Sequence, residues 1–229
     1  MKTSIHTLVW NQSVDSMVIE SHKKVTNHLG LNVNYYHENS PHGGWINRTL
    51  KESSDDVVGF FDIDCVPTNK DIVKYAQEYV YTNKTLIGTA QTSNHMGFVA
   101  RNHVFAAPAF FFIHREKWFE LGCPSFSEAD GCDVAQCVTR KAEEAGLRYQ
   151  CLYPTHWERE SSSGAWRLGN YGLYGIGTHY RGGVYHLYES RLNQNIDLFA
   201  KRCNEIVSNI FSTADMRSSF DSYSGYTCP

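Results

Sequence analysis

The sequence lacks a long apolar run, an excess of charge of one sign and any two cysteines spaced as C-x-x-C. Its longest apolar cluster, residues 104–113, falls short of the roughly 20 residues that span a membrane. Lys and Arg number 21 against 24 Asp and Glu, and the net charge of −3 is too balanced for a nucleic-acid-binding domain, which carries a basic stripe. We therefore expect neither a membrane span nor a nucleic-acid partner.

The seven cysteines show no spacing typical of a zinc ribbon or a thioredoxin-like motif. Scattered free thiols are typical of a reducing compartment, and the first residues, MKTSIHTLVWN, lack the apolar run of a secretory signal. We therefore expect a cytoplasmic protein. In that compartment the three Asn-x-Ser/Thr triplets, at Asn11, Asn47 and Asn83, are not glycosylation sites.

What the sequence does contain is an alternation of strand-like and helix-like segments. Over residues 4–89 the pattern predicts the order strand, helix, strand, helix, strand, helix, strand. This order indicates an α/β fold with a mixed, mostly parallel sheet and helices on both faces. No linker, repeat or low-complexity tract interrupts it, so we expect one domain, residues 1–211, followed by a polar tail, residues 212–229.

The bounds follow from the apolar spacing and from the residues that cap or break each segment. The predicted strands are residues 4–10, 31–36, 57–64, 86–89, 104–114, 149–153 and 184–187. The predicted helices are residues 14–29, 45–52, 69–81, 115–121, 133–145 and 190–210.

Two carboxylates stand at the end of the third predicted strand. The stretch VVGFFDIDCVP, residues 57–67, leads from five strand-forming residues into Asp62 and Asp64, and Pro67 then breaks the strand. Since side chains alternate along a strand, both carboxylates are expected on one face. In open α/β sheets, ligands bind beyond the carboxyl ends of the strands.

Two close carboxylates repel each other unless a cation lies between them. Mg²⁺ and Mn²⁺ prefer carboxylate oxygens and leave positions open for phosphate oxygens. The stretch therefore predicts a site for a divalent metal and a diphosphate. A solvated strand end is the alternative, because a D-x-D triplet is common by chance.

With five further segments, the D-x-D strand resembles the GT-A fold glycosyltransferases, especially their family-2-like inverting branch. In the order that this family shows, the segments are the first strand ending at Trp10 and Asn11, GGWINRTLKESSDD, AAPAFFFIHREKWFELG, SEADGCDVAQCVTRKAEEAG and GGVYHLYESR. The resemblance spans residues 4–195. It implies an enzyme that moves a sugar from a nucleoside-diphosphate sugar, with UDP the expected nucleotide, to a hydroxyl of a glycan acceptor.

The resemblance also implies a set of metal ligands. Asp64 would bind Mn²⁺ or Mg²⁺ directly, and Asp62 would reach the metal through water or hold the ribose. His186 would be the third ligand, with His179 and His156 as its rivals. The metal would neutralise charge on the leaving diphosphate.

The resemblance further implies an acidic base before the helix over residues 133–145. Asp133 is our choice for the group that takes the proton from the acceptor hydroxyl, and such a base favours single displacement with inversion. The family usually has two adjacent acids here, whereas this sequence has Cys132 before Asp133, so Asp130 and Glu128 stay as alternatives. An acidic residue at a helix start also needs no catalytic role.

The resemblance implies that Trp10 and Asn11 contact the nucleobase of the sugar donor. Arg48 would bind the diphosphate, because the N–H groups of a guanidinium match phosphate oxygens. Burial of Trp10 and an exposed ion pair of Arg48 are the structural alternatives.

Residues 161–183 are long for an unstructured connection, and we expect them to form a lid over the substrates. Trp157, Trp166 and Tyr171 are candidates to stack on sugar faces. An ordinary loop is the alternative.

Two other classes of protein compete with this interpretation. A nucleotidyltransferase or phosphohydrolase would need a basic, Gly-rich phosphate loop near the first strand, and residues 11–16, NQSVDS, contain no Lys, Arg or Gly. A glycan-binding domain built on a decayed transferase fold would have lost the D-x-D or Asp133, and both are present. We therefore expect a soluble glycosyltransferase of a bacterial or viral surface-glycan pathway.

Overall fold

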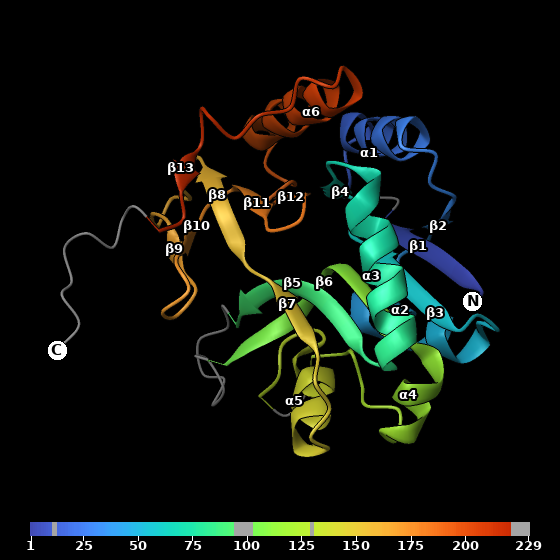
Figure 1. The fold of residues 1–229 in the computed structure, drawn as a ribbon. Coiled ribbons are helices and arrows are strands. Elements are labelled where there is room, and N and C mark those ends of the chain that lie inside the picture. Colours follow the sequence, from blue (N-terminus) through green and yellow to red (C-terminus); the bar gives the residue numbers. More distant parts are fainter. Residues whose placement is uncertain (11–12, 94–102, 129–130, 221–229) are drawn as a thin grey trace, which may run out of the picture.

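The larger of two main sheets carries the strand that leads to the D-x-D. The computed structural model describes residues 1–10, 13–93, 103–128 and 131–220, so the expected site residues Asn11 and Asp130 lie outside the described part. The strand order in this sheet is β2-β1-β3-β6-β5-β7. The strands are β1 (Thr3–Val9), β2 (Val33–His37), β3 (Val57–Phe61), β5 (Leu86–Thr92), β6 (Val104–His114) and β7 (Gln150–Leu152) (Figure 1).

The larger sheet is mixed. Strand β1 runs parallel to β2 and β3, and β5 runs parallel to β7. Strand β6 is antiparallel to both of its neighbours, β3 and β5. Three of the five strand pairs are thus parallel, and the expected mixed, mostly parallel sheet is confirmed.

Helices cover both faces of this sheet, as expected, and β3 shows why. Val57 and Phe61 belong to the core beneath α3 (Lys70–Asn83), whereas Val58 and Phe60 belong to the core formed with α2 (His42–Glu52), α4 (Arg115–Glu120) and α5 (Gln136–Glu144). This division follows from the alternation of side chains along a strand. Gly59 lies between Val58 and Phe60. A Cβ at this position would come within 2.4 Å of the Phe112 ring, so the packing of β3 on β6 requires glycine here.

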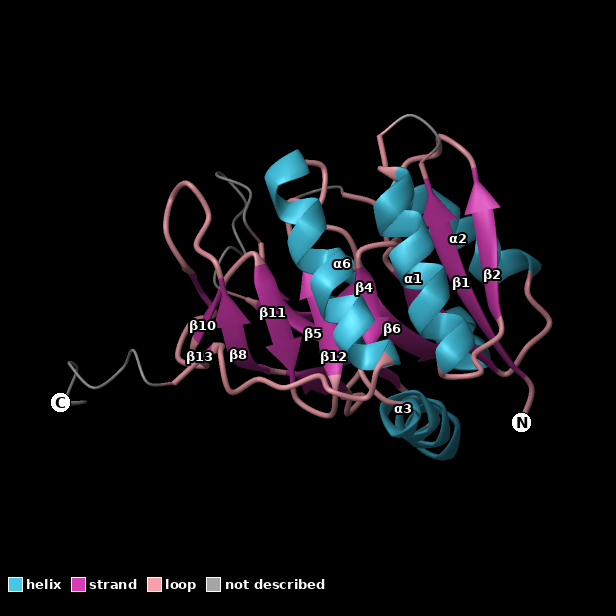
Figure 2. Cartoon of the chain, turned by 90° about the horizontal axis from the view of Figure 1, so that it is seen from above, coloured by secondary structure: helices cyan, strands magenta, loops and turns pink. Residues whose placement is uncertain are grey.

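The smaller sheet is antiparallel and has the order β13-β8-β11-β12-β4. Its strands are β4 (Cys65–Pro67), β8 (Pro154–Glu158), β11 (Gly177–Tyr180), β12 (Val184–Leu187) and β13 (Arg217–Ser218). Helices α1 (Ser16–His28) and α6 (Asn193–Val207) lie side by side and share a core with β4 and β12 (Figures 1 and 2). None of the helices in the described ranges has both the length and the apolar character that a membrane crossing requires.

The strand predicted over residues 57–64 is shorter than expected. It ends at Phe61, and Cys65 begins β4 in the other sheet. The expectation that Asp62 and Asp64 alternate along one strand is therefore wrong, because both lie in the turn that joins the two sheets.

Two structural expectations for the second half of the chain are also wrong. Residues 161–183 do not lack regular structure, since they contain β9 (Trp166–Arg167), β10 (Leu173–Tyr174) and β11, and their role as a lid stays a prediction. Residues 212–220, expected as the start of a loose tail, are packed instead, with β13 paired to β8. Strands of two residues leave no periodicity for a sequence pattern to reveal.

The smaller sheet, which carries His186, is tied to α6 by a buried cation. The Arg202 side chain is 1% exposed, and its Nε and Nη2 atoms each donate to Glu158 of β8 at 2.7 Å. It also pairs with Glu205 at 2.8 Å and with Asp215 at 3.0 Å. One guanidinium thus joins the helix, the sheet and the segment before β13.

We expect Arg202→Ala to lower the free energy of unfolding by about 3–5 kcal/mol, because it leaves the Glu158 carboxylate partly buried without its partner. The control Lys201→Ala removes a 54% exposed side chain that pairs with Glu205 and Asp215, and should cost less than about 1 kcal/mol. Urea denaturation of both variants measures the difference. Equal losses would contradict the role assigned to Arg202.

Candidate functional site

The site is built on the turn between the two sheets. At its start, the Asp62 amide donates to the Ala109 carbonyl at 2.8 Å, which ties the turn to β6. The Cys65 amide then donates to the Asp62 carbonyl at 3.0 Å and closes the turn. The two carboxylates converge because the backbone reverses here.

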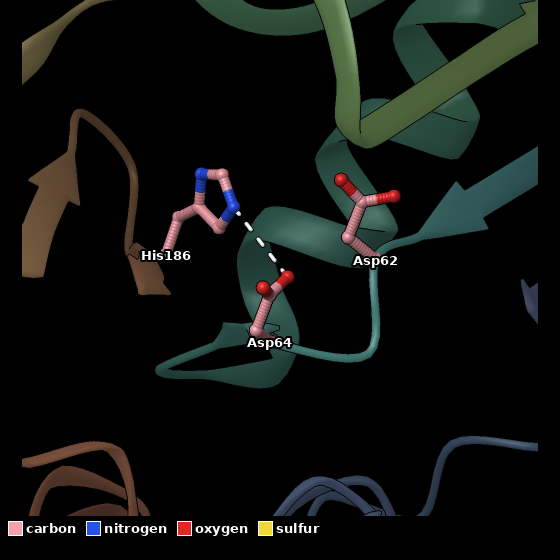
Figure 3. A group of neighbouring side chains, drawn as sticks. All are labelled: Asp62, Asp64 and His186. Carbon is pink, nitrogen blue, oxygen red and sulfur yellow. Dashed lines mark ion pairs between the residues drawn. The ribbon is translucent and has the colours of Figure 1, made fainter. Parts of the chain in front are cut away.

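His186 reaches the turn from the neighbouring strand. Strand β12 pairs with β4 in a register that sets His186 opposite Cys65, and the Leu187 amide donates to the Asp64 carbonyl at 2.9 Å. His186 Nε2 lies 3.5 Å from Asp64 Oδ1 (Figure 3). One ligand atom from each of Asp62, Asp64 and His186 lies within 4.8 Å of the others.

The other two histidines considered as ligands lie elsewhere. His179 and His156 face each other across β11 and β8, and their ring centroids are 6.3 Å apart. His179 Nδ1 is 2.9 Å from Thr155 Oγ1. Of the three candidates, only His186 is placed beside the carboxylates in the described part of the chain.

Two further side chains hold the carboxylates. Ser190 donates from Oγ to Asp64 Oδ2 at 2.5 Å. His42, the first residue of α2, has its Nε2 3.2 Å from Asp62 Oδ1 and stacks on Trp45 with a centroid separation of 6.0 Å. Neither residue was predicted from the sequence. His42 was overlooked because the helix begins three residues before the expected start at Trp45.

The two carboxylates differ in their preferred charge. Burial raises the pKa of Asp62, and the nearby Asp64 adds to this rise against the attraction of His42. Burial also acts to raise the pKa of Asp64, but hydrogen bonds from His186 and Ser190 outweigh it and hold the pKa below its ordinary value. A divalent cation between them would favour the ionised form of both.

The donor set fits a hard divalent cation. It offers two carboxylate groups, with side chains 27% and 18% exposed, and one imidazole. The Nδ1 atom of His186 is buried and has no hydrogen-bond partner among the described residues, and Nε2 is the nitrogen that faces Asp64. A neutral imidazole in this orientation can act as a ligand.

A cavity of about 130 Å³ opens beside the carboxylates. Its polar and aromatic lining consists of Trp10, His42, Asp62, Asp64, Ser190 and Arg191. Trp10 follows β1, and its Nε1 donates to the Ser40 carbonyl at 2.9 Å. Strands β1 and β3 are parallel, so their carboxyl ends meet at this cavity, where ligands of α/β sheets bind.

Arg48 is placed away from the cavity. It forms an ion pair with Glu38 and is not among the described residues that line the cavity. The cavity instead contains Arg191, whose guanidinium lies 4.5 Å from the centroid of the Trp10 ring. Arg191 stands in the segment GGVYHLYESR, but nothing in its local sequence distinguishes it from an exposed loop arginine.

Asp133 is buried, at 9% exposure, in the turn that precedes α5. Its Oδ1 accepts from the Val134 amide at 2.8 Å, and its own amide donates to Gln136 Oε1 at 2.9 Å. It does not line the cavity within the described residues. Glu128, an alternative base, is exposed. The choice of base therefore stays a prediction.

The cysteines flanking Asp133 correct another expectation. Cys132 and Cys137 form a disulfide, whereas the sequence predicted only free thiols. Cys65, Cys123, Cys151 and Cys203 are free, as expected. The pair at a separation of 5 residues has no C-x-x-C spacing, so the sequence carried no signal for it.

The aromatic residues proposed to stack on sugars have separate surroundings. Trp157 is 2% exposed in β8, where the Arg217 guanidinium lies 4.8 Å from its ring centroid, so it cannot offer a face to a ligand. Trp166 packs on Tyr174 and Tyr188 with centroid separations of 5.4 Å. Tyr171 is 47% exposed and remains accessible.

We expect Asp64→Ala to abolish Mn²⁺ binding, because it removes a ligand. Ser190→Ala should weaken Mn²⁺ binding by about 10- to 100-fold, since it frees the Asp64 carboxylate to rotate. Titration of free Mn²⁺ by electron paramagnetic resonance measures both effects. His156→Ala is the matched control and should bind as the natural chain does. Retention of Mn²⁺ by Asp64→Ala would contradict the site.

Burial lowers the pKa of His179 from about 6.5 to about 4, and His156 adds to this shift. Between pH 6.5 and about pH 4, His179 is therefore protonated in the unfolded chain but neutral in the folded chain. We expect stability to fall as the pH drops from 6.5 to 4, by at most about 3 kcal/mol from this residue. In urea denaturation, His179→Gln should lose less stability than the natural chain over that range. Parallel pH profiles would contradict this.

No protein family and no curated protein matches the sequence. Several solved structures align with part of the fold. A Drosophila β1,4-galactosyltransferase in complex with manganese, UDP-Gal and xylobiose has 13% identity and a TM-score of 0.43, covering 66% of this chain and 65% of that chain. A mannosyltransferase from Pyrobaculum calidifontis in complex with GDP-Man and Mn²⁺ has 12% identity and a TM-score of 0.44, covering 66% and 54%.

A 4-diphosphocytidyl-2C-methyl-D-erythritol synthase from Anaerococcus prevotii has 10% identity and a TM-score of 0.43, covering 66% of this chain and 86% of that chain. Glycosyltransferases are thus among the structures similar to this chain, as the sequence motifs predicted. This chain matches 65% and 54% of the lengths of the two glycosyltransferases. All three TM-scores lie below 0.5, so these similarities carry no argument about activity.

Proposed function

We propose that this chain is a metal-dependent glycosyltransferase of the GT-A type. It transfers a sugar from a nucleoside-diphosphate sugar, with UDP as the expected nucleotide, to a hydroxyl of a glycan. The observation that supports this most directly is the convergence of Asp62, Asp64 and His186 beside a cavity at the carboxyl ends of β1 and β3. Metal ligands and a cavity in one place are what a diphosphate leaving group requires.

Asp62, Asp64 and His186 would hold Mn²⁺ or Mg²⁺, and the bound metal would neutralise charge that develops on the leaving diphosphate. Ser190 keeps the Asp64 carboxylate turned toward this position, and His42 does the same for Asp62. Because these contacts fix the two carboxylates, little reorganisation would be needed when the donor binds.

The acceptor side of the reaction rests on the resemblance alone. Asp133 is the proposed base, and removal of the acceptor proton by a carboxylate supports direct displacement with inversion. Glu128 and Asp130 are the alternatives. A cytoplasmic location is also part of the proposal, for which the four free thiols among the described residues count, whereas the Cys132–Cys137 disulfide counts against it.

The test is release of UDP from a panel of UDP-sugars, with Mn²⁺ and with a chelator. We expect slow hydrolysis of one donor that needs the metal, and a loss of roughly a hundredfold or more in Asp64→Asn, because the leaving diphosphate then lacks its counter-charge. His156→Ala is the control and should keep the natural rate.

Two outcomes would replace the proposal. Release of pyrophosphate from a nucleoside triphosphate and a sugar phosphate would identify a nucleotidyltransferase. A thermal shift with glycans, without any response to Mn²⁺ and UDP, would identify a glycan-binding domain.

A further inference from the structure

The turn that follows β12 presents two side chains to the cavity. The Leu192 amide donates to the Glu189 carbonyl at 3.0 Å, so Ser190 and Arg191 are the central residues of a tight turn. The Tyr188 amide donates to the Ile176 carbonyl at 2.7 Å on one side, and Asn195 Nδ2 donates to the Glu189 carbonyl at 3.1 Å on the other. These hydrogen bonds fix the Cα positions of Ser190 and Arg191.

The two side chains contact different parts of one site. Ser190 holds Asp64, while the Arg191 guanidinium lies over the Trp10 ring at 4.5 Å from its centroid. A guanidinium over an aromatic ring is attracted by the ring and can still donate N–H groups to other partners. Trp10 is in turn fixed by its hydrogen bond to the Ser40 carbonyl.

Arg191 has no ion pair with any carboxylate of the described residues, although it lines the same cavity as Asp62 and Asp64. The other arginine considered for the diphosphate, Arg48, is paired with Glu38. The cavity therefore contains one guanidinium held in place by an aromatic ring and available to an anion.

We propose that Arg191 binds the phosphate of the donor that lies farther from the nucleoside, and that Trp10 is the positioning residue for Arg191. This inference rests on the proposed function. Two ionised carboxylates and one divalent cation sum to zero charge, so the charge of a bound diphosphate needs a further cation. The planar fork of arginine matches two phosphate oxygens at once.

The same arrangement gives Trp10 a role besides the one expected at the nucleobase. The Arg191 guanidinium lies over one face of the Trp10 ring, 4.5 Å from its centroid. Trp10 thus acts on the phosphate through the guanidinium. The inferred contact discriminates nucleoside diphosphates from nucleoside monophosphates, which lack the second phosphate.

The test is calorimetric titration of the full chain with UDP and with UMP at saturating Mn²⁺. We expect Arg191→Ala to weaken UDP binding by about 10- to 100-fold, as for a lost hydrogen bond to a charged group, with a change of less than about threefold for UMP. Arg191→Lys should bind UDP with intermediate affinity, because an ammonium has no fork. Arg181→Ala, in the exposed turn between β11 and β12, is the control and should not change either affinity.

The role of Trp10 has its own readout. Trp10→Leu should weaken UDP more than UMP, and Trp10→Phe, which keeps a ring, should restore most of the difference. In the Arg191→Ala background, Trp10→Leu should have no further effect on the ratio of UDP to UMP affinity. An equal effect in both backgrounds would overturn the positioning role.

Titration with Mn²⁺ in the absence of nucleotide distinguishes a loss of the Arg191 charge from a change in the structure of the turn. Removal of Arg191 should leave Mn²⁺ affinity unchanged or slightly higher, because a like charge is lost near the metal. Loss of Mn²⁺ binding in Arg191→Ala would show that the residue only shapes the turn, and would overturn the inference.

The remaining outcomes separate this inference from the proposed function. Unchanged UDP affinity in Arg191→Ala would overturn the inference alone. If the natural chain binds neither UDP, GDP nor CDP with Mn²⁺, the inference and the proposed function both fail.

Discussion

The chain passes from one sheet to another within three residues, and the candidate site depends on this crossing. Backbone hydrogen bonds fix it on both sides, since Asp62 is tied to β6 of the larger sheet and Asp64 to β12 of the smaller one. A turn held at both ends cannot shift without disturbing a strand register. The carboxylates are therefore placed by the packing of two sheets, which is more rigid than a loop on the surface.

This placement carries an electrostatic cost that the surroundings only partly offset. Two carboxylates in one partly buried turn raise each other's energy when both are ionised. His186 and Ser190 stabilise the charge of Asp64, whereas Asp62 has its pKa raised despite the nearby His42. Burial and the nearby Asp64 thus act against the ionised form of Asp62. A divalent cation between the two carboxylates would favour that form.

The sequence predicted the parts of this arrangement that depend on local patterns. The β1 and β12 strands, the D-x-D at a strand end and the interest in His186, which lies beside it, all followed from segments of a few residues and from the family resemblance. The antiparallel direction of β6 and the presence of Arg191, instead of Arg48, in the cavity did not. Both depend on contacts between residues far apart in the chain, and the hydrophobic pattern of a strand is the same in either direction.

The turn after β12 links the metal position to the cavity where we propose that the diphosphate binds. Ser190 acts on a metal ligand and Arg191 faces the cavity, and they are neighbours in one hydrogen-bonded turn. If the metal and the diphosphate bind as proposed, each must strengthen the binding of the other by the same factor, because binding free energies are reciprocally linked. The metal contributes to this link because it cancels the charge of the two carboxylates, which would otherwise repel the diphosphate.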